Sequence, residues 1–188
     1  MVFEFFEKIA FENKNADFTD TFYYIFQEYH KALKEIYRKK EMTFEKASKL
    51  ELALYLLFRA DFILQKSSKP NIRQLFLEKS LKRIQGDMPD ELLDLCYLRL
   101  EIYGKIYNDF ENKQGNIFSI EFLNFSYDWL ISAIELCKDD YKLMAKEKYI
   151  PLSLSITSNY PIKVCLQELD IKYTKKFIES INNIIKQS

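Results

Sequence analysis

The chain has 188 residues, with 28 basic and 28 acidic side chains and therefore a formal net charge of zero. This length suits one domain whose core needs no disulfide or metal to fold. With only 3 glycines and 4 prolines, the sequence lacks the turn residues of an all-β fold or a flexible linker. The balanced charge also argues against a dedicated nucleic-acid-binding domain, which is typically basic.

Apolar residues recur at three- and four-residue steps along most of the chain, which is the period of amphipathic helices. The first predicted helix spans 18–40, and Thr43 is a candidate N-cap for a second over 44–66. A third, over 71–85, follows a proline and ends at a glycine. Further helices are predicted over 89–113, 119–138 with an extension toward 148, 161–169 and 172–186.

One segment departs from this period, because Ile150, Leu152, Leu154 and Ile156 alternate with polar residues or proline. No other segment offers it a partner strand, so we interpret it as an extended connector or a short helix. The chain as a whole predicts an all-α fold with about six to eight helices in one bundle, up-and-down or irregular. Helical-repeat-like stacking is the alternative.

The predicted domain covers 1–188, with a core bundle at about 18–148 and a C-terminal helical segment at 151–187 packed on it. The helix over 119–138 is apolar around most of its circumference. Because such a helix packs on several sides, it is the best candidate for the centre of the bundle.

Two charged residues fall on apolar helix faces, where an isolated charge is costly. Asp61 projects into the core face of the helix over 44–66, and Arg99 into that of the helix over 89–113. We predict that Asp61 and Arg99 meet in the interior and fix the register of the two helices, with a tyrosine hydroxyl as a further partner. In the functional alternative, this pair anchors a ligand or a protein partner in a pocket.

Arg59 lies on the outward side of its predicted helix, near Leu52, Tyr55 and Ile63. Arginine beside exposed apolar and aromatic groups is enriched at protein interfaces. These four residues are therefore a candidate interaction surface. The competing interpretation is that the phenylalanine-rich N-terminus covers them.

The zero net charge is the sum of sequence segments with opposite net charges. Segment 66–83 carries six basic residues and one acid, whereas 1–30 and 87–101 are acidic. The basic segment is the candidate surface for nucleic acid or an acidic partner, since clustered cations bind phosphates. The residues that would make this contact are Arg73, Lys79, Lys82 and Arg83. Pairing between these segments inside the fold is the simpler interpretation.

His30 is the only histidine, and the three cysteines lie far apart in apolar surroundings. A di-iron bundle needs Glu-x-x-His motifs on two helices, a zinc site needs clustered ligands, and a thiol protease needs a histidine base. We therefore predict no catalytic residue, no metal and no cofactor, and we interpret His30 as a packing residue. Free thiols favour a reducing, cytoplasmic location, and the longest uncharged stretch, 149–162, is too short and polar to span a membrane.

These features favour a non-enzymatic helical module that binds another protein or a second copy of itself, as an adaptor, inhibitor, regulator or complex subunit. The second hypothesis is a nucleic-acid-associated accessory protein that uses segment 66–83. The third is a small-molecule binder or enzyme with an aromatic-lined pocket between helices.

Overall fold

The computed structural model describes residues 18–65, 70–86, 90–114, 120–146 and 160–187, and it confirms the all-α prediction. The described residues form seven helices and no strand. The helices are α2 (Phe18–Lys39), α3 (Ala47–Gln65), α4 (Pro70–Gln85), α5 (Asp90–Gln114), α6 (Ile120–Cys137), α7 (Tyr141–Lys146) and α8 (Tyr160–Gln187). The alternating segment at 150–156 and the phenylalanine-rich N-terminus lie outside the described residues.

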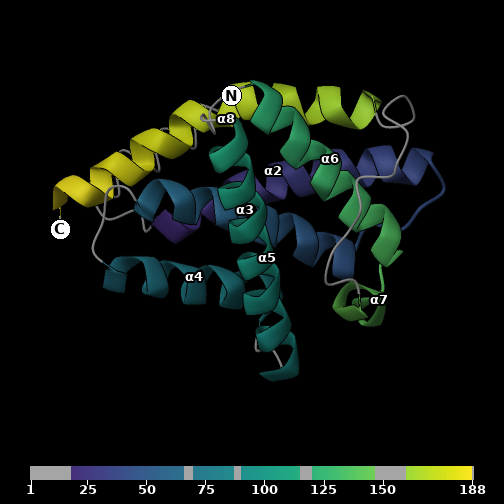
Figure 1. Ribbon diagram of the computed structural model, residues 1–188, viewed down its shortest axis with the longest axis horizontal. Coiled ribbons are helices and arrows are strands. Elements are labelled where there is room, and N and C mark those ends of the chain that lie inside the picture. Colours follow the sequence, from purple (N-terminus) through teal and green to yellow (C-terminus); the bar gives the residue numbers. More distant parts are fainter. Residues whose placement is uncertain (1–17, 66–69, 87–89, 115–119, 147–159, 188) are drawn as a thin grey trace.

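The helices pack around α3, which contacts α2, α4, α5, α6 and α8. Figure 1 shows α8 running antiparallel to α2, and these two helices pack closely along their length. α5 runs across the direction of α2 and α4, and its N-terminal turns extend past α4 at the bottom of the view (Figure 1). The result is an irregular bundle in which the last helix closes over the first described one.

α3 occupies the centre because it is apolar in nearly every direction. All residues from 50 to 57 are buried, including Glu51. A helix with this pattern has no solvent face and packs on all sides. The helix predicted to be central, 119–138, corresponds to α6, which is well buried from Tyr127 to Ile134 but packs as a neighbour of α3.

Two helix boundaries differ from the predicted ones. The predicted helices over 161–169 and 172–186 form one continuous helix, α8, since no glycine or proline separates them. The predicted extension of 119–138 toward 148 is interrupted after Cys137, where Lys138 and Asp139 both adopt positive φ angles of 44° and 61°. This left-handed turn ends α6 and directs the chain into the short helix α7.

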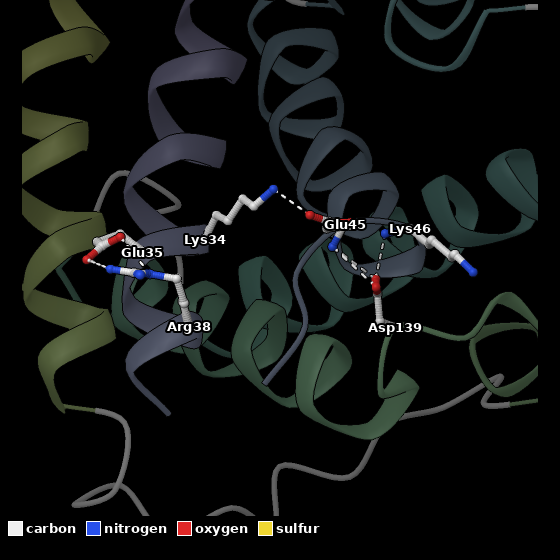
Figure 2. A network of polar contacts seen from close by, with 6 residues as sticks. All are labelled: Lys34, Glu35, Arg38, Glu45, Lys46 and Asp139. Atoms are coloured by element: carbon white, nitrogen blue, oxygen red, sulfur yellow. Dashed lines mark hydrogen bonds and ion pairs between the residues drawn. The ribbon is translucent and has the colours of Figure 1, made fainter. Parts of the chain in front are cut away.

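The same turn supplies the cap for α3. Figure 2 shows the Asp139 carboxylate at the start of α3, where Oδ1 accepts hydrogen bonds from the backbone N–H groups of Lys46 (2.7 Å) and Glu45 (3.2 Å). The Ser48 N–H donates to the same oxygen at 3.2 Å. Asp139 therefore takes the capping role that the sequence analysis gave to Thr43, and α3 begins at Ala47.

We expect Asp139→Ala to lower the free energy of unfolding by about 1–2 kcal/mol, because backbone donors at the start of α3 lose their acceptor. Asp139→Gly should cost less, since glycine relieves the left-handed backbone at φ 61°. Asp139→Asn keeps an acceptor and should cost least. Urea denaturation ranks the three variants by stability. Faster amide exchange at 45–48 in the alanine variant would locate the loss of stability at the start of α3. Unchanged exchange there would contradict a capping role.

Candidate functional site

A buried carboxylate on α8 joins four helices. Asp170 accepts hydrogen bonds from the hydroxyl groups of Tyr29 on α2 and Tyr127 on α6. Its Oδ1 also lies 2.5 Å from a guanidinium nitrogen of Arg59 on α3. We call these four residues the Asp170 cluster. Its charges are matched, and both carboxylate oxygens are occupied by donors.

The two tyrosines of the Asp170 cluster act as neutral donors. Burial, followed by the negative charge of Asp170, raises the pKa of both Tyr29 and Tyr127 well above the ordinary value. Each hydroxyl therefore keeps its proton and directs it at the carboxylate. This arrangement holds α8 in register against α2, α3 and α6, because moving α8 would leave several buried polar groups unpaired.

A second buried cluster joins α3 to α5. Arg99 donates to both carboxylate oxygens of Glu51, at 3.0 Å from Nε and 2.6 Å from a terminal nitrogen. The Tyr103 hydroxyl donates to the same carboxylate at 2.6 Å. Arg99 and Glu51 are each only 1% exposed, and the guanidinium lies over the Trp129 ring of α6 at 6.0 Å. We call this group the Glu51 cluster.

Tyr55 links the two clusters through the middle of α3. Its ring lies 6.1 Å from the ring of Tyr103 and 5.7 Å from the guanidinium of Arg59. Its hydroxyl forms a 3.1 Å hydrogen bond with Ser126 on α6, and burial raises its pKa to about 12. Tyr55 therefore contacts both clusters: its ring packs against Tyr103 of the Glu51 cluster and lies near the Arg59 guanidinium of the Asp170 cluster.

The structure gives Arg99 a different carboxylate from the predicted one. Glu51 binds the guanidinium through both oxygens, whereas Asp61 lies ten residues further along α3, about 15 Å away along the helix axis. Arg99 cannot bridge that length while it holds Glu51. The predicted Asp61–Arg99 pair is therefore replaced by Glu51–Arg99, with Tyr103 as the tyrosine partner, and Asp61 is half-buried elsewhere on α3.

The candidate interaction surface around Arg59 is covered within the fold. Leu52 and Tyr55 are buried, and the Arg59 side chain is 23% exposed and paired with Asp170. The covering elements that contact this side of α3 include α6 and α8. Arg59 is therefore an internal partner of α8 instead of an outward anchor; the Ile63 side chain lies outside the described residues.

Part of the basic segment is paired with α2. Arg83 forms an ion pair with Asp20, and its guanidinium lies 4.7 Å from the centre of the Tyr23 ring. Lys79 and Lys82 are exposed on α4, and the Arg73 side chain lies outside the described residues. Asp20 of α2 thus pairs with one cation of the candidate nucleic-acid surface.

The thiols lie in the interior or at its edge. Cys96 and Cys137 are buried, Cys165 is half-buried, and all three are free. Burial, reinforced by Glu51, raises the pKa of Cys96 to about 12, so this thiol stays protonated at neutral pH. Among the described residues, no group of three or more His, Cys, Asp or Glu side chains is placed to hold a metal ion.

His30 packs between two phenylalanines, at 5.9 Å from the ring centre of Phe26 and 5.6 Å from that of Phe44. Within the described part of the chain, its buried Nε2 has no hydrogen-bond partner. Burial, followed by the positive charge of Lys49, lowers the pKa of His30. The imidazole is therefore neutral at pH 7, as a packing residue would be.

This environment predicts acid sensitivity. The unfolded chain binds a proton at His30 near pH 6.5, whereas the folded chain binds it only at lower pH. The free energy of unfolding should therefore fall as the pH drops below 6.5. In His30→Phe this contribution disappears, so the difference in stability between pH 7 and pH 5, measured by urea denaturation, should shrink. An equal pH dependence in both proteins would contradict the assignment.

The described surface has large apolar side chains on two helices. On α5, Tyr97 is 44% exposed and Leu98 is 37% exposed; on α8, Tyr160 is 68% exposed and Ile171 is 83% exposed. None of the four belongs to the core cluster or to the partly buried residues packed against it. No described helix is long and apolar enough to cross a membrane.

Comparison with protein-family models, curated proteins and solved structures finds no match to this chain.

Proposed function

We propose that this protein is a non-enzymatic helical module that binds another protein. The observation that carries this proposal is the exposure of Tyr97, Leu98, Tyr160 and Ile171 on the outer faces of α5 and α8. None of the four belongs to the core cluster, and burial of such side chains is a main source of affinity at protein interfaces. The proposal includes a regulatory or scaffolding role, as an adaptor, inhibitor or complex subunit.

The internal networks support the same proposal. The Asp170 and Glu51 clusters use their charged groups to hold helices in register, which suits a rigid scaffold that presents its outer faces. A preformed surface loses little conformational entropy on binding. We further propose a cytoplasmic location, which the three free thiols support.

The test is affinity purification of the tagged full chain from its native host, with quantitative mass spectrometry. The test variant replaces the exposed apolar residues by serine: Tyr97→Ser, Leu98→Ser, Tyr160→Ser and Ile171→Ser. The matched control changes four exposed polar residues: Gln27→Ser, Lys31→Ser, Lys142→Ser and Lys175→Ser. Circular dichroism verifies that both variants are folded.

We expect a protein to copurify in stoichiometric amount with the wild type and the control, and its recovery to fall at least about tenfold with the test variant. A tenfold loss of affinity corresponds to about 1.4 kcal/mol of binding free energy, which is less than several interface side chains together usually contribute. Recovery of no stoichiometric protein, or equal recovery with both variants, would contradict the proposal.

The nucleic-acid alternative makes a different prediction. Because the chain has no net positive charge, we expect single-stranded RNA to bind no more tightly than about 10⁻⁴ M at physiological salt, the weak end of non-specific binding. Fluorescence anisotropy with a labelled oligonucleotide measures this affinity. Tighter, salt-sensitive binding that disappears in Lys79→Glu/Lys82→Glu would favour the alternative over protein binding.

A further inference from the structure

The outward face of α5 combines apolar and acidic side chains in a regular pattern. The exposed residues along this face of the helix are Asp94, Tyr97, Leu98, Glu101, Lys105 and Asn108. Their spacing by three or four residues, with Tyr97 and Leu98 as adjacent members, places them on one side of the helix. The opposite side carries the buried residues that contact the bundle, including Arg99 and Tyr103.

Tyr97 and Leu98 lie between two carboxylates. Asp94 is one turn before the apolar pair and Glu101 is one turn after it. The two acids are seven positions apart, which corresponds to about 10 Å along the helix axis. The face therefore presents an apolar centre flanked at both ends by negative charge.

The other described helices leave this face accessible. α5 packs on the bundle mainly through α3, and its N-terminal turns extend beyond α4 (Figure 1). Asp94 forms no ion pair within the described ranges. Glu101 pairs with Lys105 at 2.7 Å, but their side chains are 60% and 70% exposed, so a partner can displace this contact at little cost.

We propose that this face of α5 binds a basic amphipathic helix of a partner protein. Apolar residues of that helix would cover Tyr97 and Leu98, while lysine or arginine residues about two turns apart would meet Asp94 and Glu101. The charge pattern favours this class of partner, because a cation at each end of the contact complements both carboxylates and fixes the register. The inference rests on the proposed function and names the site and the chemistry of its partner.

The test uses two synthetic peptides of about 18 residues, long enough to form a helix, that share a leucine stripe. One carries lysine on its polar face and the other carries glutamate. Each is titrated into the ¹⁵N-labelled full chain, followed by NMR. We expect the lysine peptide to shift amides within 94–101 and to bind at least about tenfold more tightly than the glutamate peptide at low salt.

Two variants localise the contact. Tyr97→Ser/Leu98→Ser should weaken binding of the lysine peptide at least about tenfold. The matched control Gln27→Ser/Glu168→Gln changes an exposed polar residue of α2 and an exposed acid of α8, both outside the proposed binding residues, and it should leave affinity within about twofold. The charge reversal Asp94→Lys/Glu101→Lys should invert the preference, so that the glutamate peptide binds more tightly.

The inference is wrong if both peptides bind equally, if the shifted amides lie on other helices, or if sedimentation shows that α5 is covered by a second copy of the chain. These three results concern only the α5 site, and the proposed function is tested separately by the copurification experiment. A native partner whose recovery depends on Tyr160 and Ile171 but not on Tyr97 and Leu98 would support the proposed function and refute the α5 site. Absence of any native partner would refute the proposed function, whatever the peptides do.

Discussion

Asp170→Ala is expected to lower the free energy of unfolding by about 3–5 kcal/mol. The substitution leaves the Arg59 guanidinium without its carboxylate and removes the acceptor of two buried tyrosine hydroxyls. Breaking a largely buried ion pair from one side is costly because the remaining charge keeps only part of its contact with water. Since a typical domain is stable by about 5–15 kcal/mol, this single change should remove a large fraction of the total. Urea denaturation followed by circular dichroism measures it.

The control for Asp170→Ala is Glu168→Gln, an exposed position on the same helix, which should change stability by less than about 0.5 kcal/mol. Asp170→Asn keeps a side-chain acceptor and the size of the group, so it should lose less than alanine. If alanine prevents folding, the asparagine variant and Arg59→Met still report on the cluster. A loss below about 1 kcal/mol in all three would show that the network does not hold α8 in place.

The all-α fold could be predicted because helical periodicity is local. The apolar stripes of α2 and α6, and the low content of glycine and proline, are visible within windows of a few turns. The central position of α3 was harder to predict, because an amphipathic pattern was assumed for this helix. That pattern predicts one core face and one outward face. Leu52 and Tyr55 are as deeply buried as Leu50 and Leu54, so the run from 50 to 57 has no outward side.

Several residues of the buried clusters can be recognised from a local pattern in the sequence. A charge on an apolar stripe identified Arg99, and the same criterion identifies Asp170, which lies in line with Ile162, Leu166 and Tyr173 on α8. Glu51 is the one charged residue within the buried run of α3. Choosing among Asp61, Glu51 and Asp170 as partners required knowing which helices touch and in what register, which is tertiary information that no local pattern contains.

Arg99→Met should lower the free energy of unfolding by about 3–5 kcal/mol, because it leaves the Glu51 carboxylate buried opposite an apolar side chain. Arg99→Lys should also be destabilising, although it keeps the charge. Lysine offers a point charge on a flexible stem, whereas Arg99 donates from two nitrogens of one planar group and lies over Trp129. Urea denaturation of both variants measures the difference.

The double variant Glu51→Leu/Arg99→Met separates the cost of an orphaned charge from the value of the pair. Because well-packed apolar groups often replace a buried ion pair without loss, the double variant should be more stable than Arg99→Met alone. Tyr103 would then lose its acceptor, so adding Tyr103→Phe should restore stability further. A double-mutant cycle on Glu51 and Arg99 should give a coupling energy above about 1 kcal/mol, and additive effects would contradict the contact. The Glu51–Arg99 ion pair attaches α5 to α3. Binding of the lysine peptide to the triple variant therefore tests whether this ion pair also fixes the position of α5, in addition to stabilising the fold.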